Sequence, residues 1–386
     1  MSQRQTPHAM LPDIDHDENA RQDFVFSFRR HLATQVSPGT TVAYESRVEP
    51  RFFKEHGRNP ADHDEIRKVM VEDPYYQIWS CMQRNSQMMM WDSVIDSCER
   101  VLPDMIEKAR DFNGPATLKL ASLGFEVPRY HTSYDIHLQP GGYHTESTLD
   151  DIAAGMVYDT AVPIYAMGMM GPENDATGET LVHFYKTNYA ACAPERILDL
   201  GCAIGNSTIP WAKAYPNAEV HGIDVAAPCL RYGHARANAM GHEVHLSQQN
   251  AEKTDFPDNH FDVIGSALLF HETSRQAVTN IMTEMHRILR PGGVMVHMDA
   301  FEQDASGEPI QEFLATWEVF NNNEYFLKQL RLIDIIDELE ICGFDQTKCS
   351  FQKTPYVTQT HVIKKAAKGY MAGGFRDINV LVAEKE

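Results

Sequence analysis

The stretch of sequence that decides the fold is Arg196-Ile-Leu-Asp-Leu-Gly-Cys-Ala-Ile-Gly-Asn-Ser207. Its first residues predict a short buried strand, its glycines predict a turn, and the residues that follow predict the start of a helix. Such a turn places backbone N–H groups and a helix start over a ligand at the end of the strand. A dinucleotide fingerprint would require glycine where Ala203 and Asn206 stand, so the pattern favours a nucleoside ligand without a pyrophosphate.

The segments after this turn alternate between predicted strands and stretches long enough for crossover helices. The strands are expected at Ala218–Ile223, Val244–Ser247, Phe261–Leu269 and Val294–Met298. This alternation predicts an α/β fold with a mostly parallel sheet and helices on both faces. A final pair of strand-like segments, Thr347–Gln352 and Ile378–Ala383, is expected to add an antiparallel edge strand.

The part of the chain before this sheet has a different sequence pattern, without the alternation of strands and helices. Residues 1–20 are polar and acidic and are expected to form a flexible arm. Residues 21–150 are expected to be mainly helical, and the clearest helix runs from Tyr75 to Leu102 with an apolar face that includes Ile78 and Met88. Residues 151–180 are interpreted as a linker, and residues 181–386 as the domain that holds the sheet.

Polar residues stand at the ends of the predicted strands, where parallel strands present a ligand crevice. Asp199 ends the first strand, and Asp224 ends the second, where a carboxylate can accept both hydroxyls of a ribose. Taken alone, Asp224 could equally be a turn or helix-capping residue. Asn250 and Ala251 follow the third strand, at the place where an amide can reach an adenine edge.

The fourth and fifth strands are followed by candidate catalytic residues. His271 and Glu272 follow the fourth strand, and Asp299 follows the fifth. A base is needed wherever an oxygen or a protonated nitrogen must lose its proton, and these side chains can serve that purpose. The structural alternatives are a packed His271, a helix-capping Glu272 and a hydrogen-bonding or capping Asp299.

These motifs, taken in order, carry a resemblance. The series Asp199-Leu-Gly-Cys-Ala-Ile-Gly205, Asp224, Asn250-Ala251, Phe256–Asp262 and Leu289-Arg-Pro-Gly-Gly293 resembles the seven-stranded, Rossmann-like methyltransferases that use S-adenosylmethionine. The resemblance covers about residues 196–301, and residues 302–386 more weakly. It implies a seven-stranded sheet and S-adenosylmethionine as the cofactor. It also implies a donor site in which Gly201 and Gly205 line the methionine part, Asp224 holds the ribose, and Asn250 and Ala251 flank the adenine. Asp199 and Cys202 complete the candidate donor-binding set, with Cys202 interpreted as a packing residue.

The expected function is therefore methyl transfer to an oxygen, nitrogen or sulfur atom of a small molecule. Such a transfer is an in-line displacement, so the protein chiefly aligns the two reactants and excludes water. Two alternatives stay open. One is a protein that binds S-adenosylmethionine without catalysis, and the other is a nicotinamide-dependent oxidoreductase, which Ala203 and Asn206 disfavour.

Two further segments are candidates for the acceptor side. His131, Asp135, His137 and His144 could bind a metal, but their spacing matches no ligand pattern, so no metal is expected. The segment from Tyr130 to His144 is interpreted either as a lid hinged at Pro140-Gly141-Gly142 or as a plain linker. Trp317 and Asn321–Glu324 could line an acceptor pocket or form a polar loop.

Composition excludes several classes of function. Among the 386 residues, 34 Lys and Arg stand against 54 Asp and Glu, a net charge of −20, so a nucleic acid is not expected as a partner. The chain has no apolar run of the length that crosses a membrane and no visible secretory signal. Its seven cysteines form no C-x-x-C pair, which favours reduced thiols and a cytoplasmic location. The oligomeric state is left open, with a homodimer among the candidates.

Overall fold

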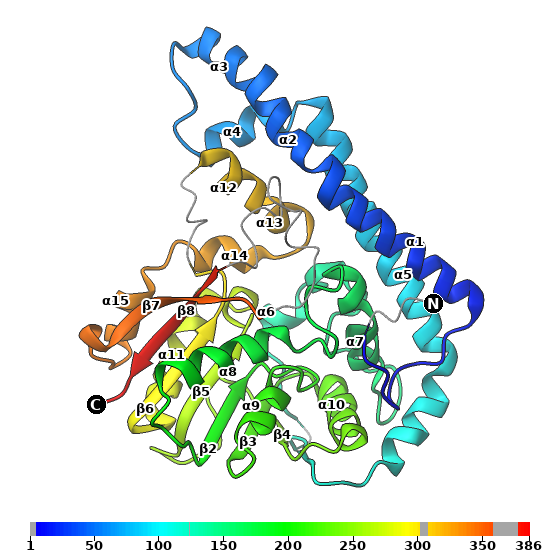
Figure 1. Cartoon of the computed structure of the whole chain (residues 1–386), viewed down its shortest axis with the longest axis vertical. Coiled ribbons are helices and arrows are strands. Elements are labelled where there is room, and N and C mark those ends of the chain that lie inside the picture. Colours follow the sequence, from blue (N-terminus) through cyan, green and yellow to red (C-terminus); the bar gives the residue numbers. More distant parts are fainter. Residues whose placement is uncertain (1–4, 123, 302–307, 358–376) are drawn as a thin grey trace.

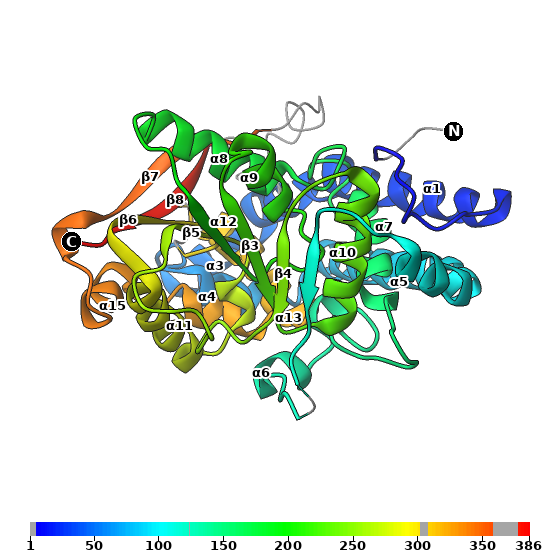
Figure 2. The same ribbon diagram turned by 90° about the horizontal axis from the view of Figure 1, so that it is seen from below.

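An eight-stranded sheet forms the centre of the molecule, and helices cover both of its faces (Figures 1 and 2). The computed structural model describes residues 5–122, 124–301, 308–357 and 377–386. The strands are β1 (Thr117–Lys119), β2 (Arg196–Leu200), β3 (Glu219–Asp224), β4 (His245–Gln248), β5 (Phe261–Ala267), β6 (Leu289–Met298), β7 (Cys349–Pro355) and β8 (Asp377–Glu384).

The helices fall into an N-terminal set, which precedes α7, and a second set from α7 onward, most of which surrounds the sheet. The first comprises α1 (His16–His31), η1 (Leu32–Val36), α2 (Pro38–Ala43), η2 (Tyr44–Val48), α3 (Glu49–His56), α4 (His63–Met70), α5 (Pro74–Asp111), α6 (Arg129–Thr132) and η3 (Ile136–Leu138). The second comprises α7 (Ala153–Tyr165), α8 (Ala176–Asn188), α9 (Thr208–Ala214), α10 (Ala227–Met240), η4 (Phe270–Glu272), α11 (Arg275–Ile288), α12 (Pro309–Ala315), α13 (Trp317–Asn321), α14 (Tyr325–Leu330), α15 (Ile335–Ile341) and η5 (Gln346–Lys348).

The strand order in the sheet is β1-β4-β3-β2-β5-β6-β8-β7. Every neighbouring pair from β1 to β6 is parallel, and β8 runs antiparallel to both β6 and β7. The α/β class with a mostly parallel sheet is confirmed. The expected count of seven strands is wrong, because Thr117–Lys119, in the region expected to be helical, pairs with β4 as an eighth strand. The antiparallel strand is also not at the edge: β8 lies inside the sheet, and β7 is the edge strand.

Alternating side chains of the strands face two separate cores, as the period of a β-strand requires. On one face, Ile197 packs with α8 and with Trp211 of α9. On the other face, Leu198 packs with α11 and α15. Because β2 has β3 on one side and β5 on the other, the strand order reverses beside it. The crevice at the carboxyl ends of these strands is where open α/β sheets bind their ligands.

The N-terminal helices form a long arm that projects from the body (Figure 1). Residues 16–56 are almost continuously helical, with two π-helical segments, η1 and η2, and they run alongside α5 in the opposite direction. The apolar face expected for α5 differs from the observed one. Trp91 and Cys98 are buried, whereas Ile78 and Met88 are 59% and 48% exposed, because α5 packs mainly on α1 and α7 along other positions.

Segments far apart in sequence meet at both ends of this arm. Near its tip, a cluster built on Tyr76 and Trp79 packs against Phe313 and Trp317 of α12 and α13. Near its base, Met10 is fully buried beside α5 and α7, so the described part of the expected flexible arm packs on the body. Residues 151–180, interpreted above as a linker, contain α7 and the start of α8. None of the helices in the described ranges has the length and apolar character that crossing a membrane requires.

Candidate functional site

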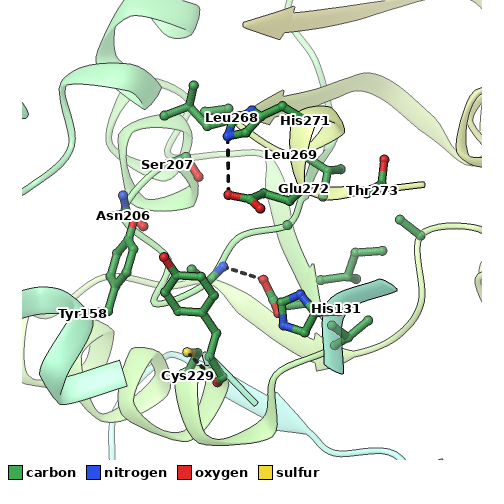
Figure 3. Close-up of a pocket in the computed structure, with 18 of the residues that line it drawn as sticks. His131, Tyr158, Asn206, Ser207, Cys229, Leu268, Leu269, His271, Glu272 and Thr273 are labelled. Carbon is green, nitrogen blue, oxygen red and sulfur yellow. Dashed lines mark hydrogen bonds and ion pairs between the residues drawn. The ribbon is translucent and has the colours of Figure 1, made fainter. Parts of the chain in front are cut away.

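A cavity of about 290 Å³ lies at the carboxyl ends of β2, β3, β4 and β5. The loops after these strands line it together with the segment 130–143, helix α7 and Glu324. Figure 3 shows Tyr158 of α7 beside Asn206, and His271 beside Glu272. The residues that line the cavity are Tyr130, His131, His137, Tyr143, Tyr158, Tyr165, Met170, Thr177, Gly201, Ala203, Asn206, Ser207, Ile223, Asp224, Val225, Cys229, Gln249, Asn250, Ala251, Ala267, Leu268, Leu269, His271, Glu272, Thr273, Ile281 and Glu324.

The turn after β2 is held tightly against the end of β3. The N–H groups of Gly201 and Cys202 both donate to the carbonyl of Ile223, at 2.9 and 3.0 Å. Gly201 has a φ of +68°, and a Cβ at this position would lie 2.8 Å from Leu269 Cδ1. Only glycine satisfies both the left-handed backbone and the close approach of the neighbouring loop. The absence of a side chain here leaves the backbone open to the cavity.

Asp224 joins this turn to the end of β3. One of its carboxylate oxygens accepts a hydrogen bond from the N–H of Ala203 at 2.9 Å, and the other accepts from the N–H of Ala226 at 2.8 Å. Each carboxylate oxygen can accept a further bond. The carboxylate is therefore oriented by the backbone and lines the cavity with accepting capacity to spare. Asn250 and Ala251, predicted to lie nearby, line the same cavity.

Three residues of the expected donor-binding set do not line the cavity. Asp199 is fully buried, and one of its carboxylate oxygens accepts from the hydroxyls of Ser207 and Thr208, at 2.7 and 2.6 Å. Burial raises the pKa of Asp199 to about 6. The Cys202 side chain packs in an apolar cluster under the sheet, and burial raises the pKa of its thiol well above the usual range. Gly205, with a φ of +77°, shapes the turn behind the lining residues. Asp199, Cys202 and Gly205 therefore stabilise the turn from outside the cavity.

The candidate catalytic residues separate into two that face the cavity and one behind them. His271 and Glu272 line it, and Figure 3 shows the two side chains side by side. Asp299 does not line it. One oxygen of the Asp299 carboxylate lies 2.6 Å from His271 Nδ1, and the other accepts from the N–H of Phe270 at 2.6 Å. Asp299 therefore orients the imidazole, which leaves His271 Nε2 directed toward Glu272 at 3.4 Å.

His137 and Glu324 extend this polar end of the cavity. His137 Nε2 lies 3.3 Å from a Glu272 oxygen and 3.1 Å from a Glu324 oxygen, and His137 Nδ1 lies 2.6 Å from the hydroxyl of Tyr143. Burial would lower the pKa of His137, but the carboxylates of Glu272 and Glu324 outweigh burial and raise it to about 9. Burial likewise opposes the charge on His271, and Asp299 with Glu272 raises its pKa well above the usual range.

The segment 130–144 contributes wall residues from both sides of its glycine turn. Tyr130, His131, His137 and Tyr143 line the cavity, whereas His144 does not. Gly141 and Gly142 have φ values of +79° and +62°, which explains the glycine pair in the turn. In the described part of the chain, only His137 of this segment joins a group of potential metal ligands, and its partners come from η4.

Sequence reasoning missed the aromatic wall that α7 supplies. Tyr158 and Tyr165 stand two helical turns apart on this helix, and both line the cavity. The Tyr158 ring lies 5.9 Å from the Tyr143 ring, and the Tyr165 ring lies 5.7 Å from His137. Two tyrosines seven residues apart, a spacing that places both on one face of a helix, are the sequence signal that could have indicated this wall. Trp317 and Asn321–Glu324 were the other candidates for an acceptor pocket. Of these, Glu324 lines the cavity, whereas Trp317 is buried in the cluster near the tip of the arm.

Known proteins match the chain over this part of the structure. Residues 197–293 match the family described as "Methyltransferase domain". A demethylmenaquinone methyltransferase of Thermus thermophilus is 35% identical over 107 residues, which cover 28% of this chain and 48% of that protein. A fatty-acid O-methyltransferase of Mycolicibacterium smegmatis is 29% identical over 136 residues, or 35% of this chain and 48% of that protein.

Solved structures of methyltransferases also align with part of the chain. The Haemonchus contortus phosphoethanolamine N-methyltransferase 2 in complex with S-adenosyl-L-methionine aligns with a TM-score of 0.36 at 18% identity, covering 50% of this chain and 48% of that one. The chain spans about half the length of the curated relatives described above. The family match confirms the resemblance over residues 197–293, which match a methyltransferase domain.

Proposed function

We propose that this protein transfers the methyl group of S-adenosylmethionine to an oxygen or nitrogen atom of a small molecule. The observation that carries the proposal is that one cavity joins the turn after β2 to the polar end formed by His271 and Glu272. A donor held at that turn and an acceptor held at the polar end would lie in one enclosed space. Enclosure matters because methyl transfer requires alignment of the two reactants and exclusion of water.

The residues at the turn fit the donor. A Cβ at position 201 would collide with Leu269, and Gly201 has none. The backbone of the turn can therefore lie close to the ligand. Asp224 would accept the ribose hydroxyls, and Asn250 with Ala251 would flank the adenine. When bound, the donor supplies a methyl carbon made electrophilic by a positively charged sulfur. The described residues around this end therefore serve to bind and orient.

The polar end serves the acceptor. The lone pair of the acceptor atom would form the new bond to the methyl carbon as the carbon–sulfur bond breaks and its electron pair passes to sulfur, so that S-adenosylhomocysteine leaves; the acceptor must also lose its proton. His271 and Glu272 are the side chains placed to contact the acceptor. Glu272 can take up that proton, whereas the raised pKa of His271 keeps its imidazole protonated, so that it donates to the acceptor or to Glu272. Asp299 acts as a positioning residue through His271 Nδ1. Polar groups of this kind favour oxygen or nitrogen over sulfur, because a thiolate needs less help to react.

The region before the methyltransferase domain would determine which acceptor is used. Tyr143 and His137 from the segment 130–144, with Tyr158 and Tyr165 from α7, line the same cavity as the donor-binding loops. We assign residues 21–150 to the acceptor side and residues 181–386 to donor binding. A small, partly aromatic acceptor fits this aromatic lining, and a nucleic acid does not fit a chain with a net charge of −20. The seven free cysteines support a cytoplasmic location.

Substitution of His271 by alanine tests the proposal. We expect turnover to fall by about 10²–10⁴-fold, the usual contribution of a positioned acid or base, while affinity for S-adenosylhomocysteine is retained. Acceptors would first be found by incubating a metabolite extract with donor that carries an isotopically labelled methyl group. His183→Ala is the matched control, because His183 is exposed on α8 and is not among the residues that line the cavity. Donor binding without transfer to any acceptor in the extract would contradict the proposal and favour a non-catalytic binding protein.

A further inference from the structure

Two histidines and two glutamates converge at the polar end of the cavity. They come from three separate parts of the chain: His137 from η3, His271 and Glu272 from η4, and Glu324 from the residue before α14. The ligand atoms of His137, His271 and Glu272 all lie within 4.8 Å of one another. We propose that these three side chains bind a divalent transition-metal ion, with Glu324 next to them as a partner of His137.

The spacing of the ligand atoms matches a coordination shell. His137 Nε2 lies 3.3 Å from Glu272, and His271 Nε2 lies 3.4 Å from Glu272. Two ligand atoms each about 2.1 Å from an ion are about 3.4 Å apart at a tetrahedral angle and about 3.0 Å apart at a right angle. Both measured separations fall in this interval. An ion can therefore be placed with little movement of the side chains.

The outer partners of both histidines match those of metal ligands. A metal-binding histidine presents one nitrogen to the ion and gives the other to a carboxylate or another polar group, which fixes the ring. His271 Nδ1 lies 2.6 Å from Asp299, and His137 Nδ1 lies 2.6 Å from the hydroxyl of Tyr143. Both Nε2 atoms are thereby directed at the same Glu272 oxygen. Simple ion pairs between histidine and glutamate would not require both second nitrogens to be fixed in this way.

The donor set indicates the class of ion. Two imidazole nitrogens and one carboxylate oxygen suit zinc, manganese, cobalt or iron in the divalent state, whereas magnesium and calcium prefer oxygen ligands alone. Glu272 supplies one negative charge when ionised, and Glu324 lies beside His137 as a second nearby carboxylate. His137, His271 and Glu272 all line the cavity, so an ion bound by them would face the space in which the acceptor is expected to bind.

The inference rests on the proposed function, because the ion would lie where the acceptor is expected to bind. A cation there would hold an acceptor oxygen or nitrogen and lower the pKa of its proton. His271 would then be a ligand of the ion, and the ion would replace it as the group that makes proton loss easier. Methyl transfer and metal binding are nevertheless separate properties, and they can be measured separately.

The test is metal binding by the full-length protein after removal of bound metal with EDTA. Cobalt(II) is titrated while its visible absorption is recorded, and zinc(II) is titrated by calorimetry. We expect one equivalent to bind, and His137→Ala and Glu272→Gln to weaken binding by at least about tenfold, the loss that even an outer partner of a ligand causes. Asp299→Asn is expected to weaken it by about 10–100-fold. His144→Ala is the matched control, since His144 lies in the same segment but outside the cluster, and it should bind as the wild type does.

Binding of S-adenosylhomocysteine is measured in the same preparations, so that a misfolded variant is recognised and the two proposals are separated. Unchanged cobalt binding in both His137→Ala and Glu272→Gln would overturn the metal site. Absence of stoichiometric binding in the wild type up to about 1 mM ion, a weak limit on affinity, would overturn it as well. If methyl transfer then proceeds at full rate in EDTA, the proposed function stands without the ion. If the ion binds but S-adenosylhomocysteine does not, the metal site stands and the methyltransferase proposal fails.

Discussion

Replacement of Asp159 tests how the aromatic wall of the cavity is held in place. Asp159 follows Tyr158 on α7, and its side chain is fully buried. Its carboxylate lies within hydrogen-bonding distance of Asn174 Nδ2 at 2.7 Å, His8 Nε2 at 3.0 Å, the Tyr232 hydroxyl at 3.0 Å and Arg236 Nε at 3.2 Å. One side chain thus ties α7 to the N-terminal segment, to the loop before α8 and to α10.

The expected cost follows from the burial of this network. Arg236 is only 1% exposed, so Asp159→Ala leaves its charge buried without its partner, which typically costs about 3–5 kcal/mol. Asp159→Asn keeps the shape and removes only the charge. Burial opposes ionisation of Asp159, but Arg236 and the hydrogen bonds outweigh it and lower its pKa from 3.8 to about 2. A shift of that size corresponds to about 2 kcal/mol at neutral pH, which is the expected cost of the asparagine variant.

Urea unfolding followed by circular dichroism measures both variants. Because the folded pKa is depressed, this stabilisation is fully present above pH 4 and is lost as the pH falls toward 2. The difference between wild type and Asp159→Asn should therefore shrink over that range. Asp150→Ala is the control, since its ion pair with Arg110 is largely exposed and should contribute less than about 1 kcal/mol. A cost for Asp159→Ala no greater than that of the control would refute the reasoning.

Three further outcomes are expected in the methyltransferase domain. Asp224→Ala should weaken S-adenosylhomocysteine binding by roughly ten- to a hundredfold in calorimetry, because hydrogen bonds to a charged acceptor contribute about 1.5–3 kcal/mol; unchanged affinity would remove Asp224 from the site. Gly201→Ala should lower both donor affinity and thermal stability, since its Cβ would lie 2.8 Å from Leu269 Cδ1 at a φ of +68°; a variant that binds normally would show that the loop after β5 can move aside. Asp199→Asn should remove a pH dependence of the free energy of unfolding. Burial raises the pKa of Asp199 from 3.8 to about 6, so the wild type should lose about 3 kcal/mol of stability relative to the variant as the pH rises from 4 to 6. Parallel pH profiles of the two proteins would contradict this.

The methyltransferase domain was predictable because its signals are local. A buried strand, a turn that needs Gly201 and a helix follow one another directly, and hydrophobic pattern with backbone sterics is enough to identify each of them. Asp224 was predictable for a similar reason, since the end of one parallel strand lies beside the end of the next. β1 escaped prediction because it has three residues and exists as a strand only through its pairing with β4.

The acceptor side could not be predicted to the same extent, because its parts meet only after the chain has folded. By itself, the sequence determined the α/β class, the turn at Gly201 and the candidates His271, Glu272 and Asp299. Tertiary packing decided that Asp299 lies behind His271, and that His137 and Glu324 join the same polar cluster. The physical reason is that strand order and glycine turns depend on short-range sterics and periodicity, whereas convergence of distant side chains depends on how α7, η3 and α14 pack over the sheet.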